Sequence, residues 1–75
     1  AYQMIAEICV RGKSCFEIYY GDQIVGTIKE DSKHRWEAHF FITTWDYFNP
    51  AHVERIKSMT AEKVKLLNIT ARLTK

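Results

Sequence analysis

Features that would point directly to a function are scarce in this chain. It has one proline and two cysteines, Cys9 and Cys15. Two cysteines are too few for a disulfide scaffold, and their spacing is not that of zinc ligands. We therefore expect free thiols in a reducing compartment, which favours a cytoplasmic location. No apolar run exceeds three residues, which is far short of a membrane span. The sequence accordingly predicts no membrane partner, no cofactor and no metal.

The charge balance is equally unspecific. Eleven Lys and Arg residues stand against nine Asp and Glu residues, giving a formal net charge of +2. Nucleic-acid-binding domains usually carry a clustered excess of basic residues, so this balance does not by itself indicate such a ligand. Apolar residues, in contrast, are abundant at 47%, with 13% aromatic. That fraction excludes a disordered chain, and the length predicts a single domain over residues 1–75.

Residues 1–44 alternate between apolar and polar positions, as half-buried strands do. The turn-forming segments RGK, GDQ and KEDSK divide this region into four strands. In the first strand, the residues predicted on the apolar face are Tyr2, Met4, Ala6, Ile8 and Val10. The pattern therefore predicts an antiparallel meander with one face on the core and one polar face.

The loop lengths decide which side chains face the core, because a shift of one residue moves every side chain to the other face. A two-residue loop at Gly21 and Asp22 would leave Ile24 on the polar face, so a three-residue loop is predicted there. The resulting pairs are Tyr20–Ile24, Ile18–Gly26 and Phe16–Ile28, followed across the next turn by Ile28–Trp36, Gly26–Ala38 and Ile24–Phe40. A three-residue RGK loop would likewise place Cys9 opposite Cys15. Gly26 and Ala38 then form a shallow spot that a helix can approach closely.

The segment after the strands predicts a helix. Asn49 is a good N-cap and Pro50 suits the first helical position. Phe48 and Val53 then occupy the two positions of a hydrophobic staple. Residues 67–73 fit either a helix extension or a strand, and their alternation favours a short fifth strand. The predicted class is α+β, with a four-stranded antiparallel meander packed on one C-terminal helix and then a fifth strand or a helix extension.

No residue pattern indicates an enzyme. The nearest approach to a catalytic arrangement is Cys15 with His39 on the polar face, and no orienting carboxylate, oxyanion donor or pocket is evident beside them. The histidines and cysteines lack the close spacing of metal ligands. Glu30 and Asp31 lie in a turn and have no cleft between them. We therefore expect no catalytic activity.

The polar face of the sheet is the better candidate for function. Exposed aromatic residues beside charged ones suit a protein interface, including a homodimer. The residues predicted to bind a partner are Tyr19, Val25, Arg35, His39, Phe41 and Trp45. An alternative is nucleic-acid binding through the same face, using Lys13, Lys29, Lys33 and Arg35. Trp45 also has a second interpretation, in which it packs beneath the helix with Phe48.

The expected layout of residues 14–60 is a three-stranded sheet backed by one helix. This layout resembles plant ethylene-response-factor domains and integrase N-terminal arms, which bind DNA through the sheet. The resemblance is one of architecture and rests on no shared motif. It implies DNA contact through the polar face, whereas Arg35 is the only arginine in strands two to four and those sheets present several.

Overall fold

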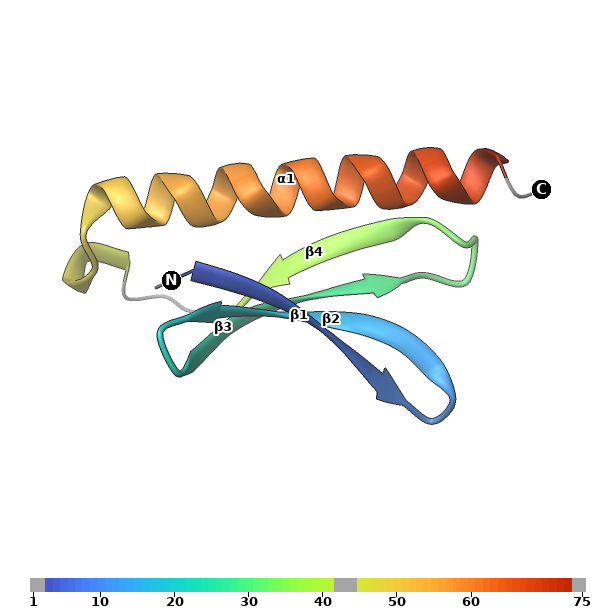
Figure 1. The fold of residues 1–75 in the computed structure, drawn as a ribbon, viewed down its shortest axis with the longest axis horizontal. Helices are drawn as coiled ribbons and strands as arrows, with labels where there is room; N and C mark the ends of the chain where they lie inside the picture. Colours follow the sequence, from blue (N-terminus) through green and yellow to red (C-terminus); the bar gives the residue numbers. More distant parts are fainter. Residues whose placement is uncertain (1–2, 42–44, 74–75) are drawn as a thin grey trace.

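A computed structural model describes residues 3–41 and 45–73 of the chain. Its elements, in chain order, are β1 (Gln3–Val10), β2 (Lys13–Tyr20), β3 (Gln23–Glu30), β4 (Trp36–Phe40), the 3₁₀ turn η1 (Trp45–Tyr47) and α1 (Pro50–Leu73). The strands form one antiparallel sheet in the order β1-β2-β3-β4, and α1 lies across one face of it (Figure 1). The predicted α+β class and four-stranded meander are confirmed.

The preferred fifth strand is wrong, because α1 continues without interruption to Leu73. The apolar residues of its second half divide between two sides of the helix. Val64 and Leu67 pack against the core of the sheet. The residues on the other side, Leu66, Ile69 and Leu73, remain exposed. A helix with two apolar sides is therefore accommodated by leaving one side in solvent, which the sequence pattern did not favour.

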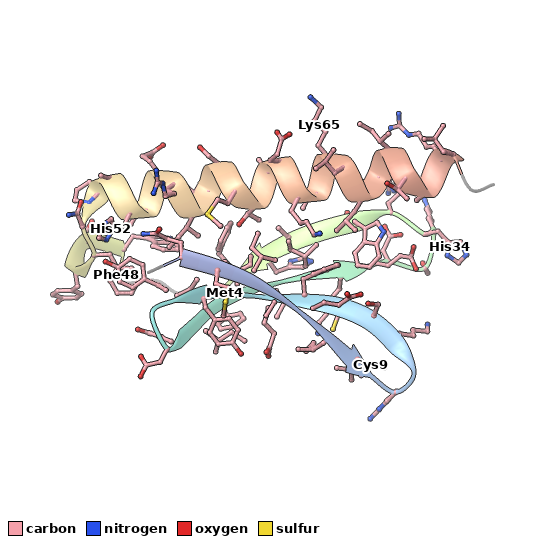
Figure 2. The ribbon with its side chains drawn as sticks, in the orientation of Figure 1. Met4, Cys9, His34, Phe48, His52 and Lys65 are labelled. Atoms are coloured by element: carbon pink, nitrogen blue, oxygen red, sulfur yellow. The ribbon has the colours of Figure 1, made fainter. Side chains whose placement is uncertain are left out.

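The start of α1 is the one predicted. The side-chain oxygen of Asn49 accepts a hydrogen bond from the backbone N–H of Ala51 at 2.9 Å, and Pro50 is the first helical residue. Phe48 stacks on Tyr20 with ring centroids 4.7 Å apart. His52 and the Tyr20 hydroxyl are hydrogen-bonded at 2.6 Å, and Figure 2 shows Phe48 and His52 close together at this end. The helix start is thus fixed to the end of β2.

Replacing Asn49 by Ala should lower the free energy of unfolding by about 1 kcal/mol, because one of the first N–H groups of α1 loses its acceptor. Urea unfolding followed by circular dichroism measures this loss. Asn49→Ser, which keeps an acceptor oxygen, is the matched control and should lose only a few tenths of that amount. Equal losses in the two variants would show that the cap is not what Asn49 contributes.

The β1–β2 turn contradicts the predicted register. Arg11 and Gly12 both have positive φ, 53° and 79°, as the central residues of a type I′ turn do. The loop therefore has two residues, and Val10 pairs with Lys13. The two faces of β1 are therefore exchanged relative to the prediction. Ile5 packs on the core, whereas Met4, Ala6, Ile8 and Val10, which were predicted on the core face, lie on the opposite face with Tyr19 and Cys15. Tyr2, also predicted on the core face, lies outside the described residues.

The β2–β3 hairpin also has a two-residue loop, where a three-residue loop was predicted. A β-bulge then shifts the register of the two strands by one residue. Gly21 has φ of 63°, which suits the first central position of a type II′ turn. Tyr19 pairs with Ile24, and the register then shifts by one residue so that Ile18 pairs with Gly26. The predicted pairs Ile18–Gly26 and Phe16–Ile28 are confirmed and the pair Tyr20–Ile24 is wrong. The extra residue is Val25, which the bulge turns into the core.

The β3–β4 register differs from the predicted one by two residues, so the faces are right and the partners are wrong. Trp36 pairs with Glu30, Ala38 with Ile28 and Phe40 with Gly26. The reason is the tight loop between the strands, in which the Asp31 N–H donates to the Arg35 carbonyl at 2.8 Å. The shallow spot at Gly26 therefore lies beside Phe40, and the side chains of Phe40 and Ile18 approach it.

The core lies between the sheet and α1. Its fully buried side chains are Ile18, Val25, Ile28 and Ile56, and the rings of Trp36, Phe40, Trp45 and Phe48 pack around them. β1 contributes only Ile5 to this cluster. The face of the sheet away from α1 therefore keeps the other apolar side chains of β1.

Asn68 of α1 binds the outer edge of β4. Its side-chain oxygen accepts from the Trp36 N–H at 2.8 Å, and its amide donates to the Trp36 carbonyl at 3.2 Å. Both backbone groups of Trp36 consequently point away from β3. The amide takes the place that a neighbouring strand would occupy, which closes this edge of the sheet at Trp36.

Candidate binding surface

The face of the sheet that α1 does not cover is called here the open face. Its apolar and aromatic residues are Met4, Ala6, Ile8, Val10, Cys15, Tyr19 and Ile24, and its polar residues include Lys13, Glu17, Thr27, Lys29, Glu37 and His39. Phe41 follows Phe40, which packs on the core, so strand alternation places Phe41 on the open face as well. Met4 is 52% exposed and Phe41 54%, and Figure 2 shows Met4 on the side of β1 away from the helix. The open face is thus more apolar than the sequence pattern predicted.

Three predicted partner-binding residues lie on the open face. The Tyr19 hydroxyl donates a hydrogen bond to the Glu17 carboxylate at 2.6 Å, and this bond raises the pKa of Tyr19 above its usual value. His39 is exposed, with Nε2 3.8 Å from the Glu37 carboxylate. Phe41 follows β4, and its N–H donates to the Val25 carbonyl at 3.2 Å. Tyr19 lies in the row of cross-strand neighbours Met4–Tyr19–Ile24, and His39 lies in the next row, with Glu17 and Thr27. Polar groups therefore border the apolar residues.

The other three predicted partner-binding residues lie elsewhere. Val25 was predicted on the open face, but the bulge buries it completely. Trp45 lies in η1 with its ring edge-on to Phe40 and Phe48, at centroid distances of 5.7 and 5.8 Å. It therefore belongs to the border of the core, as its second interpretation had it. Arg35 precedes β4 in an exposed loop, 3.6 Å from the Asp31 carboxylate.

The cations of the nucleic-acid alternative gather at one end of the sheet. Lys13 and Lys29 line a cavity of about 510 Å³ between the β1–β2 turn and the β3–β4 loop, and Lys33 lies in that loop. The acidic residues Glu30 and Asp31 line the same cavity. Positive charge at this end is therefore mixed with negative charge and forms no uniform basic patch.

Asp31 organises the loop that borders this cavity. Its carboxylate accepts hydrogen bonds from the backbone N–H of Lys33 at 2.8 Å and of Arg35 at 2.9 Å. These bonds, that of Arg35 above all, hold the pKa of Asp31 below its usual value. Because the charged form is the one that accepts, its contribution to loop stability is present above the unfolded pKa and is lost as the pH falls through the lowered folded pKa. The Asp31 carboxylate thus stabilises the β3–β4 loop through these two hydrogen bonds.

The cysteines do not meet, contrary to the predicted pairing. Cys9 pairs with Ser14 and is exposed, whereas Cys15 pairs with Ile8 and is buried. The two thiols therefore lie on opposite faces of the sheet. Within residues 3–41 and 45–73, no group of three or more His, Cys, Asp or Glu side chains is arranged to hold a metal ion.

Sequence reasoning missed the apolar residues of β1 as surface residues, because it assumed that the more apolar face of each strand is buried. The dipeptide Arg11-Gly12 carried the signal that could have located them, since glycine in second place favours a two-residue type I′ loop.

Along the described part of the chain, α1 lacks the apolarity that crossing a membrane would need. The chain matches no protein-family model, no curated protein and no solved structure.

Proposed function

We propose that this chain is a non-enzymatic protein-association module that binds a partner protein through the open face of its sheet. The observation that carries the proposal is the run of apolar side chains along β1 on the face that α1 leaves uncovered. Tyr19 and Ile24 continue this run across β2 and β3. Contiguous exposed apolar patches on small proteins commonly mark interaction sites.

The energetics favour a protein partner. Burying an exposed Met or Phe side chain contributes about 1.5–3 kcal/mol, and Met4 and Phe41 are each more than half exposed. Polar groups such as Glu37 and His39 border the apolar residues, as the rim of a protein interface does. The cations, in contrast, are mixed with carboxylates at the end of the sheet. This distribution suits a protein better than a phosphate backbone.

Affinity capture with the tagged chain as bait tests the proposal. Phe41→Ser should weaken capture of a specific protein, because Phe41 is an exposed open-face residue that lies outside the core cluster. Leu73→Ser is the matched control: Leu73 is 80% exposed on α1, away from the open face, and its loss should leave capture unchanged. Equal effects of the two substitutions, or no captured protein at all, would contradict the proposal.

Salt separates the proposal from nucleic-acid binding. Apolar association should hold between about 50 and 200 mM salt, whereas phosphate binding by Lys13, Lys29, Lys33 and Arg35 should fall steeply over that range. Filter binding of mixed oligonucleotides at both salt concentrations provides the measurement. Tight retention at low salt that disappears at high salt, and that is lost in Lys13→Gln/Lys29→Gln, would favour the nucleic-acid alternative instead.

A further inference from the structure

The outer edge of β1 is a long strand edge that no other described strand covers. β1 has eight residues, pairs with β2 without a register shift and ends the sheet. The two-residue turn makes Val10–Lys13 a hydrogen-bonded pair, and such pairs then alternate along an antiparallel ladder. The residues whose backbone N–H and C=O groups point away from β2 are therefore Gln3, Ile5, Glu7 and Cys9.

The opposite edge of the sheet does not offer the same template. β4 has five residues, and the outward backbone groups of its first residue, Trp36, are bonded to Asn68. Short edges and covered edges are two of the devices by which proteins prevent strand pairing. β1 has neither device, and its open-face side chains are apolar.

We infer that a second copy of this chain pairs antiparallel with β1 about a two-fold axis at Ala6, joining the two sheets into one continuous sheet. The inference rests on the proposed association function and names a second copy as a partner. Strand addition at an exposed sheet edge is a general mode of recognition, in which backbone hydrogen bonds supply affinity. The pairing would form about eight such bonds, two for each hydrogen-bonded pair.

The register follows from the backbone and from one charge. Outward residues of one copy must face outward residues of the other, so the two-fold axis has to pass through a residue of β1. The two registers with the longest overlap place the axis at Ala6 or at Glu7. An axis at Glu7 would set the two Glu7 carboxylates directly opposite each other, which is destabilising. With the axis at Ala6, Glu7 faces Ile5 of the second copy.

The side chains of the open face fit this register. Met4 faces Ile8 of the second copy, so two apolar side chains that are now partly or largely exposed cover each other. Ala6 faces its own counterpart in a non-hydrogen-bonded pair, where Cα atoms approach to about 4.5 Å. The small alanine side chain permits this approach. The two open faces then adjoin across the axis and form one larger binding surface.

Disulfide trapping tests the register. In a chain carrying Cys9→Ser and Cys15→Ala, we expect Ala6→Cys to oxidise rapidly to a covalent dimer, because the distance across the axis suits a disulfide. Ile8→Cys in the same background is the matched control. It should form little covalent dimer on oxidation, since Ile8 faces Met4 of the second copy and not the other Ile8. Equal cross-linking of the two variants, or cross-linking of Ile8→Cys alone, would overturn the register.

A second pair of variants tests the edge itself. The Glu7 N–H points away from β2, so Glu7→Pro should keep the hairpin while removing a donor from the dimer contact. Glu7→Ala also loses the hydrogen bond that the Ser14 hydroxyl donates to Glu7, but it keeps the N–H. Sedimentation is measured over a protein concentration range of about a hundredfold. Wild type and Glu7→Ala should associate within this range. In Glu7→Pro, the concentration at which half of the chains are associated should be at least tenfold higher.

The outcomes separate this inference from the proposed function. A wild-type chain that stays monomeric at every concentration overturns the inference, and capture of another protein that depends on Phe41 would still support the proposed function. Self-association that survives Glu7→Pro, with no disulfide in Ala6→Cys, overturns the β1 contact as well. A melting curve of Glu7→Pro like that of Glu7→Ala establishes that any loss of association is not a loss of fold.

Discussion

Replacing Ile56 by Ala should lower the free energy of unfolding by about 2–5 kcal/mol. Ile56 is 1% exposed and lies where α1 meets the sheet, in one cluster with Ile18 and Ile28. The loss combines the transfer free energy of the deleted methyl and methylene groups with the cavity that they leave. Small domains are stable by about 5–15 kcal/mol in total, so this one change removes a large share.

Chemical denaturation monitored by tryptophan fluorescence and circular dichroism measures the Ile56 effect. Leu73→Ala is the control within the same helix, because Leu73 is exposed and its truncation should change the stability by less than about 0.5 kcal/mol. If Ile56→Ala were as mild as Leu73→Ala, α1 would not be packed on the sheet as described.

Gly26→Ala should destabilise by about 1–3 kcal/mol through overpacking. A Cβ at this position would lie 2.6 Å from the His39 carbonyl oxygen, 3.0 Å from Phe40 Cδ1 and 3.2 Å from Ile18 Cδ1. The first of these atoms belongs to the backbone of β4, so the strand itself would have to move. Alanine is usually tolerated within a strand, but at Gly26 it would clash with the backbone of β4.

Thermal unfolding compares Gly26→Ala with Gly12→Asn. A Cβ at Gly12 would meet no atom within 4 Å, and asparagine tolerates the positive φ of that turn better than most residues. We expect the Gly26 variant to melt at a clearly lower temperature than the Gly12 variant. The reverse order would show that turn conformation matters more than the close approach of β3 and β4.

The sequence was sufficient to predict the fold class and the start of α1, because both depend on local patterns. Alternation identifies the strands, turn residues separate them, and Asn49 with Pro50 begins the helix wherever the helix packs. The predicted registers rested on a different assumption, that the apolar side of each strand is the buried side. The turn at Arg11 and Gly12 follows its own backbone preference instead, and one residue of difference reverses β1.

The composition of the open face depends on the two-residue turn at Arg11 and Gly12 and on the bulge in β3. It could not be predicted without knowing both. Ile24 and Val25 exchange roles because the bulge adds one residue to β3, and the alternation of side chains contains no signal for such an insertion. Tyr19 and His39 lie on the predicted face of the sheet, since β2 and β4 keep their predicted faces. Trp45 lies beyond the last strand, where alternation no longer applies, and contact with Phe40 and Phe48 decides its position.

The amide of Asn68 on Trp36 has a consequence for how far an assembly of this chain can grow. A sheet with two unpaired edge strands can bind one copy at each edge. Each added copy then has another unpaired edge, so the assembly can keep growing. Here the Asn68 amide occupies the outward backbone groups of Trp36, the first residue of β4, and in the proposed pairing the edge of β1 meets its own equivalent. Such an isologous contact is satisfied by one partner and closes with point symmetry. The short β4 edge and its Asn68 contact thus favour a closed pair over open-ended growth in the proposed assembly.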